Sequence, residues 1–302
     1  NVAVVFVKPH AATPQARAML PAFLGAQGIE VLRSGSVAGS DIDRRGIIDA
    51  HYASIARVGM QRDPTQLKLS APAKTKFAET FGIAVDDAVA AGSVHTAATA
   101  LEALRVSSSE FQELWLAAGC TKLGPGVYAA KMSGPGDVPI YVFNGFYASL
   151  RDKFVRPGVE VTWYEVRFDP AKLSWATFRG EVIGSTDPAK AVEGSLRAKF
   201  RDEWQALGLK AECDFQDNAV HASASPLEAL KERCVWAGAD LETDSFAAAL
   251  RARGVPEATL REFLDDAEVE TAGATKGRVF DLVEHMDTDE ALDALVGMRL
   301  AQ

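Results

Sequence analysis

The chain has 302 residues, of which 48% are hydrophobic and 24% are charged. This is enough material for a buried core, organised as one large domain or two smaller ones. There are 32 Lys and Arg residues against 41 Asp and Glu, so the formal net charge is −9. That balance excludes the clustered basic surface of a nucleic-acid-binding protein. An anionic ligand would therefore be bound by a few placed cations and not by the overall charge.

The apolar runs are too short to cross a bilayer, and we expect no membrane association. Cys120, Cys213 and Cys234 are far apart and lack the spacing of metal ligands. They indicate buried free thiols in a reducing compartment and hence a cytoplasmic protein. Because the sequence starts without methionine, we expect residues to precede Asn1.

The first 60 residues predict a strand, a helix and a second strand. Val2–Val7 is a continuous β-branched and aromatic run, which is typical of a central strand. Thr13 and Pro14 provide an N-cap followed by proline at the first helical position. The next strand is expected at residues 29–37, and one or two short helices at 41–60.

Residues 61–122 have apolar side chains at helical spacing, which predicts a helical insertion. A hairpin follows at 127–132 and 140–143. The pattern then predicts strands at 159–168 and 211–215. It also predicts helices at 146–154, from 169, at 198–207, 226–236, 246–253, 256–266 and 278–300.

With the insertion and the tail set aside, the order is β-α-β, helices, β-α-β and a final helix. This order predicts an α+β fold with a ferredoxin-like split β-α-β antiparallel sheet. The core would comprise residues 1–60 and 138–236. Residues 61–137 would form a mainly helical insertion, and residues 237–302 a helical C-terminal extension.

Residues 217–225 place an amide, an imidazole and two hydroxyl groups directly before a helix that starts at Pro226. A histidine at such a strand-to-helix corner is a candidate nucleophile, with Asn218 and Ser223 as polar neighbours of His221. Glu232, on the following helix, is a candidate partner that fixes the imidazole tautomer. Taken alone, a single histidine in this setting fits a helix cap or a core position better than a nucleophile.

Three cations have positions that suit phosphate binding. Lys8 ends the first strand before a proline and can meet a phosphate as a point charge. Arg179 and Arg197 bracket a Gly-Ser-Thr turn, and guanidinium groups match phosphate oxygens while the Thr186 hydroxyl adds a donor. Taken alone, Lys8 better fits a solvated strand end, and the two arginines better fit a polar surface loop. The remaining histidines are assigned structural or exposed positions: His10, His51, His95 and His285.

Together these residues resemble the nucleoside diphosphate kinase family. Residues 184–188 and 194–197 resemble its Gly-x-Thr-x-Pro and Gly-Thr-Ile-Arg segments. Residues 218–236 resemble its Asn-x-x-His-Gly-Ser-x-Ser signature with the helix that follows. The matches occur in order along about half of the chain. Further matches are Val7-Lys8-Pro9, His51-Tyr52, and Phe146-Tyr147 with Leu150.

The resemblance implies ping-pong transfer of a phosphoryl group from a nucleoside triphosphate to a diphosphate, through a phosphohistidine on His221 oriented by Glu232. Mg²⁺ would be carried by the nucleotide phosphates and not by protein ligands. Phe146 would stack on the base with little base specificity. The nucleotide-binding residues that the resemblance implies are Lys8, Tyr52, Phe146, Leu150, Arg179, Thr186, Arg197, Asn218 and Ser223.

The alternative is a weak or inactive kinase-like scaffold subunit in a larger assembly, such as a cytoskeletal or axonemal complex with flagellar association. The insertion, the tail and Ala222, where the family has glycine, favour this alternative. So does Ala224, where the family has an acidic residue. A third interpretation, relay of the phosphoryl group to a protein, uses the same nucleophile. Expected partners are nucleotides and a homo-oligomer or larger assembly formed through the insertion and tail.

Overall fold

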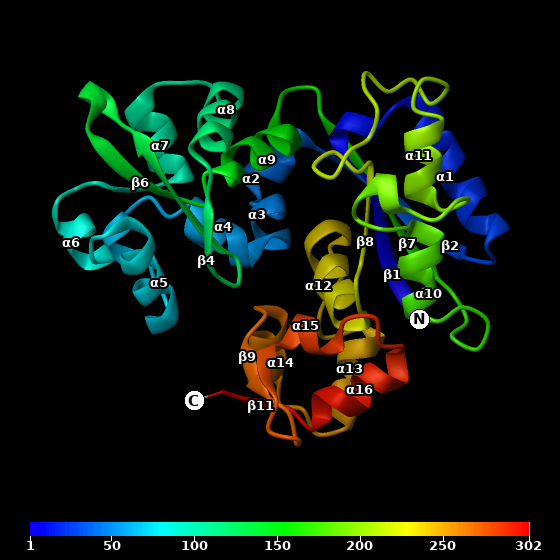
Figure 1. Ribbon diagram of the computed structural model, residues 1–302. Helices are drawn as coiled ribbons and strands as arrows, with labels where there is room; N and C mark the ends of the chain where they lie inside the picture. Colours follow the sequence, from blue (N-terminus) through cyan, green and yellow to red (C-terminus); the bar gives the residue numbers. More distant parts are fainter. Residues whose placement is uncertain (302) are drawn as a thin grey trace. The chain divides into compact units, whose positions relative to one another are not determined.

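The computed structural model describes residues 1–301 and divides into two compact units (Figure 1). The first unit consists of residues 1–47 and those from 157 onwards, and the second of residues 48–156. The chain thus divides at 47 and 156, whereas the sequence predicts an insertion spanning 61–137. Within residues 1–301, no helix has the length and apolar character needed to cross a membrane.

The first unit is built on a four-stranded antiparallel sheet in the order β2-β7-β1-β8. Because β1 and β2 both run antiparallel to β7, they are parallel to each other and are separated by one strand. The sheet strands are β1 (Val2–Val7), β2 (Glu30–Ala38), β7 (Glu160–Arg167) and β8 (Val220–Ala222). The helices around it are η1 (Pro9–Ala11), α1 (Pro14–Ala26), α2 (Gly39–Arg44), α10 (Trp175–Thr177), the π-helical turn η4 (Phe178–Ile183), η5 (Pro188–Lys190), α11 (Leu196–Asp202) and α12 (Pro226–Ala237).

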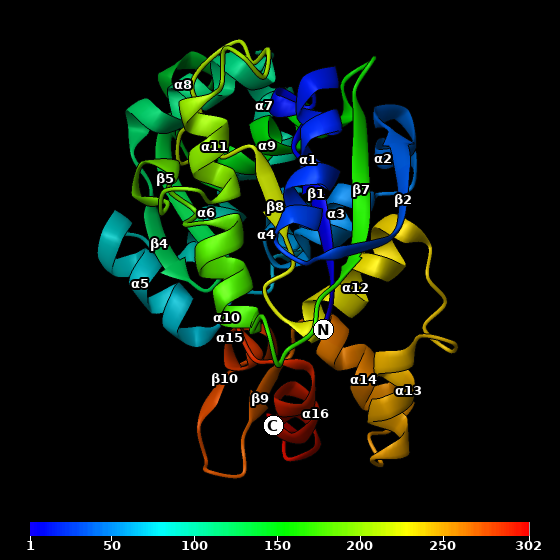
Figure 2. The ribbon, with the colours of Figure 1, turned by 90° about the vertical axis from the view of Figure 1, so that its right-hand side faces the viewer.

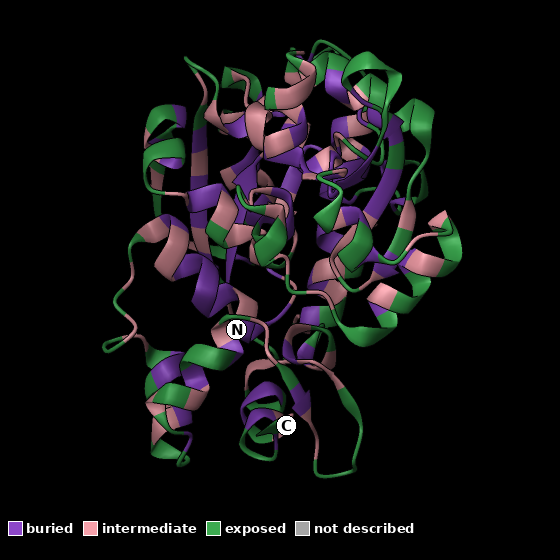
Figure 3. Ribbon diagram, turned by 90° about the vertical axis from the view of Figure 1, so that its left-hand side faces the viewer, coloured by how far each residue is buried: buried purple, intermediate pink, exposed green. Residues whose placement is uncertain are grey.

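Strand β1 is buried on both faces, which explains its continuous apolar sequence (Figure 3). On one face, Val5 and Val7 join a core with Leu20 of α1 and Phe200 of α11. On the other face, Phe6 packs against Trp236 of α12, with ring centroids 4.8 Å apart. The sheet therefore has α1 and α11 on one side and α12 on the other.

The ends of α1 and α12 follow from local sequence. Thr13 Oγ1 accepts a hydrogen bond from the Ala16 amide, and proline occupies the next position, so α1 starts where predicted. Ser225 Oγ similarly accepts from the Glu228 amide, with a proline following. Helix α12 ends at Gly238, whose φ of +63° suits glycine. Both predicted helices are confirmed.

The C-terminal part of the first unit packs on the outer side of α12 (Figures 1 and 2). Its core includes Leu227 and Leu230 of α12. The prediction that this tail is helical throughout is wrong, because it also holds a small sheet in the order β10-β9-β11. Strands of two or three residues are too short to show a period of two in the sequence. The elements are α13 (Ser245–Ala252), α14 (Glu257–Leu264), β9 (Glu268–Glu270), β10 (Lys276–Arg278), α15 (Val279–Val283), α16 (Thr288–Val296) and β11 (Arg299–Leu300).

The second unit has its own sheet, in the order β3-β6-β5-β4, with β3 parallel to β6 and the other pairs antiparallel. The predicted hairpin is confirmed as β5 and β6. The two faces of the sheet contribute to separate cores, one around Phe77 and one around Trp115. The elements are α3 (Ile47–His51), at the boundary, α4 (Ala53–Gly59), η2 (Pro64–Gln66), α5 (Ala71–Phe81), α6 (Val85–Ala90), β3 (Val94–Thr96), α7 (Ala97–Leu104), α8 (Ser108–Ala118), β4 (Thr121–Gly124), β5 (Val127–Ser133), η3 (Pro135–Asp137), β6 (Pro139–Phe143) and α9 (Phe146–Val155).

One predicted strand is absent from the part of the chain that the structure describes. Residues 211–215 are irregular and do not form a strand. Cys213 is buried there, whereas Phe215 is 65% exposed. The apparent alternation in this segment therefore reflects one buried thiol in a loop. The fourth strand of the sheet is β8, which carries His221.

Candidate active site

His221 lies at the middle of β8, opposite Phe6 of β1. Its ring stacks on the Phe6 ring, with centroids 4.7 Å apart and an angle of 23° between the planes. Phe6 is held in turn by Trp236 of α12. The histidine side chain is 15% exposed, so a ligand can reach it while most of the ring is fixed by the sheet and α12.

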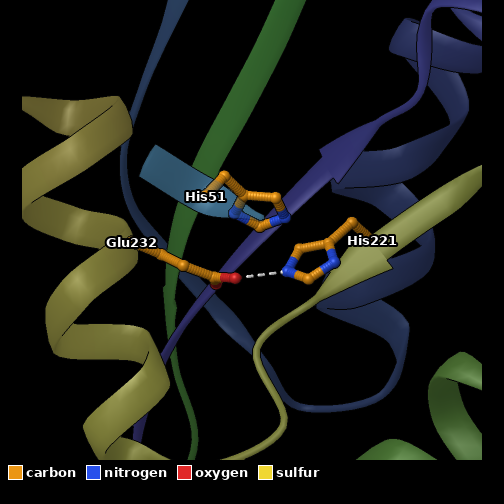
Figure 4. Close-up of side chains that lie close together, drawn as sticks. All are labelled: His51, His221 and Glu232. Atoms are coloured by element: carbon orange, nitrogen blue, oxygen red, sulfur yellow. Dashed lines mark hydrogen bonds and ion pairs between the residues drawn. The ribbon is translucent and has the colours of Figure 1, made fainter. Parts of the chain in front are cut away.

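A carboxylate on α12 holds the imidazole from one side (Figure 4). His221 Nε2 and Glu232 Oε1 are 2.5 Å apart. The second oxygen, Oε2, accepts a 2.6 Å hydrogen bond from Ser223 Oγ, and the Val4 amide donates to the same hydroxyl at 2.8 Å. Strand β1, strand β8 and α12 are thus linked through one buried carboxylate.

The electrostatic surroundings favour an uncharged imidazole. Burial is the main reason that the pKa of His221 lies well below its ordinary value of 6.5. The nearby cations Arg179, Lys8 and Arg197 lower this pKa further. Burial also raises the pKa of Glu232 to about 8. Both shifts favour the uncharged form of each side chain at neutral pH.

Arg179 and Arg197 contact the outer edge of β8. Arg179 Nη1 donates to the Ala222 carbonyl. Arg197 is 5% exposed and donates to the Gly184 carbonyl at 2.8 Å and to the Val220 carbonyl at 2.9 Å. These bonds satisfy carbonyls that an edge strand otherwise leaves unpaired. Among residues 1–301, the buried Nε of Arg179 has no hydrogen-bond partner.

Asn218 connects β8 to the turn that contains Thr186. Its Nδ2 donates to the Thr186 carbonyl at 2.9 Å, and the side chain is 3% exposed. Its Oδ1 is buried and has no hydrogen-bond partner within residues 1–301. The Thr186 side chain is exposed. A buried acceptor without a donor is costly, so Asn218 Oδ1 is a candidate ligand-binding atom.

Lys8 and Asn218 are brought together by backbone contacts at the end of β1. The Lys8 amide donates to the Ala219 carbonyl at 2.7 Å. The Ala219 amide donates to His10 Nε2 at 3.1 Å. Seven of the predicted site residues with His221 therefore belong to this one region of the first unit: Lys8, Arg179, Thr186, Arg197, Asn218, Ser223 and Glu232.

The three remaining predicted residues belong to the second unit. The Tyr52 ring meets the His51 ring edge-on, with centroids 4.5 Å apart. Phe146 starts α9 and packs on Tyr128 at 5.5 Å and on Trp115 at 6.1 Å between centroids. Leu150 lies one turn further along α9 and is half-buried. Within its unit, Phe146 therefore belongs to the packing around Trp115.

Sequence reasoning missed Phe6, His10 and Glu228. Glu228 lies one turn before Glu232, and its carboxylate accepts a hydrogen bond from the Ala224 amide. Burial, and then the charge of Glu232, raise the pKa of Glu228 to about 8. The spacing of four between the two glutamates on one helix was the signal that was available for Glu228. His10 gave no signal, because its partner Ala219 is more than 200 positions away in the chain.

The charges around His221 suit an anionic ligand. Both oxygens of Glu232 are already bonded, to His221 and Ser223. Three cations act on the imidazole.

No protein-family model and no curated protein sequence matches this chain. Two solved structures are similar in backbone. The nucleoside diphosphate kinase of Encephalitozoon cuniculi is 13% identical with a TM-score of 0.39, over 81% of this chain and 93% of that one. The enzyme of Pyrobaculum aerophilum is 14% identical with a TM-score of 0.36, over 78% of this chain and 94% of that one. Similarity at this level does not establish a substrate or an activity.

Proposed function

We propose that this protein transfers a phosphoryl group from a nucleoside triphosphate to a nucleoside diphosphate through a phosphohistidine on His221. The proposal rests on a carboxylate clamp. Glu232 is held by Ser223 through one oxygen and contacts the neutral, nearly buried imidazole of His221 through the other. A carboxylate held on both oxygens fixes the tautomer and the orientation of the ring, as a nucleophilic imidazole requires. The four-stranded order β2-β7-β1-β8, which we assign to the ferredoxin-like type, presents this clamp between the sheet and α12.

Nδ1 of His221 is the atom that we assign to the attack, because Glu232 holds Nε2. The reactive form has lost one proton: the ring carries its proton on Nε2, Nδ1 has a free electron pair, and Glu232 is negatively charged. As the bond from Nδ1 to the γ-phosphorus forms, the bond to the bridging oxygen breaks and the diphosphate leaves with that electron pair. The positive charge that develops on the imidazole is balanced by Glu232 through the 2.5 Å bond.

The second half reverses these changes. A terminal oxygen of the acceptor diphosphate attacks the phosphorus, the bond to Nδ1 breaks, and its electron pair returns to the ring. Once the pair is in this reactive form, neither half releases a further proton. Lys8, Arg179 and Arg197 neutralise phosphate charge, and the Asn218 carbonyl oxygen accepts from a ribose hydroxyl. Mg²⁺ carried by the nucleotide neutralises the remaining phosphate charge.

One observation favours the second candidate function, a nucleotide-binding scaffold subunit without transfer. Arg197 already donates to two backbone carbonyls, and Arg179 donates to a third. Donors used in this way hold the loops around β8 even without a substrate. In this alternative the nucleotide would bind, and the imidazole would not be phosphorylated.

Incubation with γ-labelled ATP separates the two functions. We expect a labelled protein that is stable in base and labile in acid, and no label on His221→Ala. His285→Ala is the matched control, because the His285 side chain is 48% exposed and the substitution keeps the backbone amide that bonds the Ala224 carbonyl. Label that persists in His221→Ala, or nucleotide binding without any label in the unchanged protein, contradicts the proposed transfer.

A further inference from the structure

Ala219, which lies between Asn218 and His221, has a backbone conformation that alanine rarely adopts. Its φ is +65°. The Val220 amide donates to the Asn218 carbonyl at 2.8 Å, which closes a three-residue turn around Ala219. A γ-turn with positive φ is rare and strained for a residue with a Cβ atom. Such a turn persists only where neighbouring groups hold it.

The groups that hold this turn come from the segment after β1. Both backbone polar groups of Ala219 are bound there, its carbonyl by the Lys8 amide at 2.7 Å and its amide by His10 Nε2 at 3.1 Å. Ala219 is fully buried, so its amide would have no water to replace the imidazole. The side chain of His10 is therefore one of two anchors of the turn.

The bonding also defines the state of the His10 ring. Because Nε2 accepts from the Ala219 amide, it carries a lone pair, and the proton of the neutral ring is on Nδ1. Nδ1 lies 3.5 Å from Asp217 Oδ1, and this carboxylate favours a proton at that corner. The imidazole thus contacts both neighbours of Asn218, accepting from the Ala219 amide and facing the Asp217 carboxylate.

We propose that His10 is a positioning residue of the phosphotransfer site and acts through the turn at Ala219 on Asn218. His10 does not touch a reacting atom. When its acceptor is removed, the buried Ala219 amide loses its partner and the turn relaxes towards negative φ. That relaxation moves the side chain of Asn218, whose Oδ1 is the candidate contact for the nucleotide. His221 is held independently, by its pairing with Phe6 and by Glu232.

This division of roles predicts a selective effect on nucleotide binding. Removal of the acceptor should raise KM and leave kcat nearly unchanged, because the attacking ring keeps its own supports. A side chain with an acceptor at the position of Nε2 should restore the turn. Glutamine meets this requirement, because its Oε1 lies about as far from the backbone as His10 Nε2. Leucine fills similar space without an acceptor.

The test compares His10→Leu with His10→Gln in the full chain. For His10→Leu we expect KM for the nucleotide to rise roughly 5- to 100-fold, with kcat within about twofold of the unchanged protein. For His10→Gln we expect KM to return to within about threefold. Equal KM values for the two variants, or a loss in kcat with KM unchanged, overturn the proposal.

Two measurements do not depend on phosphotransfer, whereas the KM comparison rests on the proposed function. Nitrogen NMR of the unchanged protein reports the His10 tautomer, and amide exchange reports the Ala219 N–H. We expect a proton on Nδ1 and slow exchange at Ala219. A proton on Nε2, or fast exchange at Ala219, overturns the positioning role whether or not the protein transfers phosphate. Absence of a phosphohistidine with these signals present contradicts only the proposed function.

Discussion

Replacement of Glu232 by glutamine should slow the protein and at the same time make it more stable. The substitution keeps the size of the side chain and removes its charge. The amide presents either its NH2 group or its oxygen to His221 Nε2, which lies 2.5 Å from the carboxylate in the unchanged protein. With the NH2 group towards the ring, the proton of the imidazole moves to Nδ1, the nitrogen that we assign to the attack. With the oxygen towards the ring, the counter-charge is absent.

The expected rate loss follows from the strength of that contact. A hydrogen bond to a charged group contributes ~1.5–3 kcal/mol. If the variant loses this free energy only in the transition state, where the ring becomes positive, phosphorylation of His221 slows roughly 10- to 150-fold. Ser223 and Phe6 still hold the site, so nucleotide affinity should change much less. The loss should therefore appear in the single-turnover rate.

The expected gain in stability follows from the raised pKa of Glu232. This pKa is about 8 in the folded protein, against an ordinary value of 4.5 that applies to the unfolded chain. Between these values the folded state holds a proton that the unfolded state has released. The free energy of unfolding therefore falls as pH rises through this window, by up to ~1.4 kcal/mol per pH unit, and is constant for this group outside it. Glutamine does not titrate, so the free energy of unfolding of the variant lacks this decrease.

Urea unfolding at several pH values, together with single-turnover labelling, checks both effects. Relative to the unchanged protein, Glu232→Gln should gain stability progressively from about pH 5 to about pH 8. A stability difference that is independent of pH would show that Glu232 does not take up a proton on folding. Labelling at the unchanged rate would refute the role of Glu232 as the partner of the imidazole.

Two further substitutions test the framework of the first unit by urea unfolding. Gly184→Ala should cost ~1–3 kcal/mol, because φ is +92° and the new Cβ would lie 2.5 Å from Ser195 Oγ, whereas Gly180→Ala, with open space around its Cβ, should be nearly neutral. Asp244→Ala should cost ~3–5 kcal/mol, because it leaves Arg233 buried without its 2.8 Å partner. Asp293→Ala, at a side chain that is 80% exposed, should change stability by less than ~0.5 kcal/mol. Equal effects within either pair would contradict the reasoning.

The sequence was informative where a pattern is local. Val2–Val7 is apolar at every position because β1 is buried on both faces, and Thr13-Pro14 and Ser225-Pro226 mark the helix starts where the structure has them. The pairing of His221 with Glu232 could be predicted, because a strand and the helix that follows it place the two side chains close together. Contacts of this kind can be predicted because both partners lie within a short segment of the sequence.

Contacts between distant segments could not be predicted in this way. Ser223 bonds to Val4 across β1 and β8, and His10 bonds to Ala219, although more than 200 residues separate each pair. Residues 211–215 gave a false strand, since alternation in sequence does not reveal whether a neighbouring strand exists to pair with. The short strands β9, β10 and β11 were missed because their partners, and not their own sequences, make them strands.

Helix α12 contributes to two cores, and this limits how the protein can evolve. One face of α12 carries Glu232 and Trp236 towards the sheet, and Leu227 and Leu230 belong to the core of the C-terminal segment. Loss of packing among residues 246–298 would therefore loosen the helix that holds the imidazole. A different C-terminal segment would keep the site only if it also buried Leu227 and Leu230. We therefore expect the C-terminal segment and the site to evolve together.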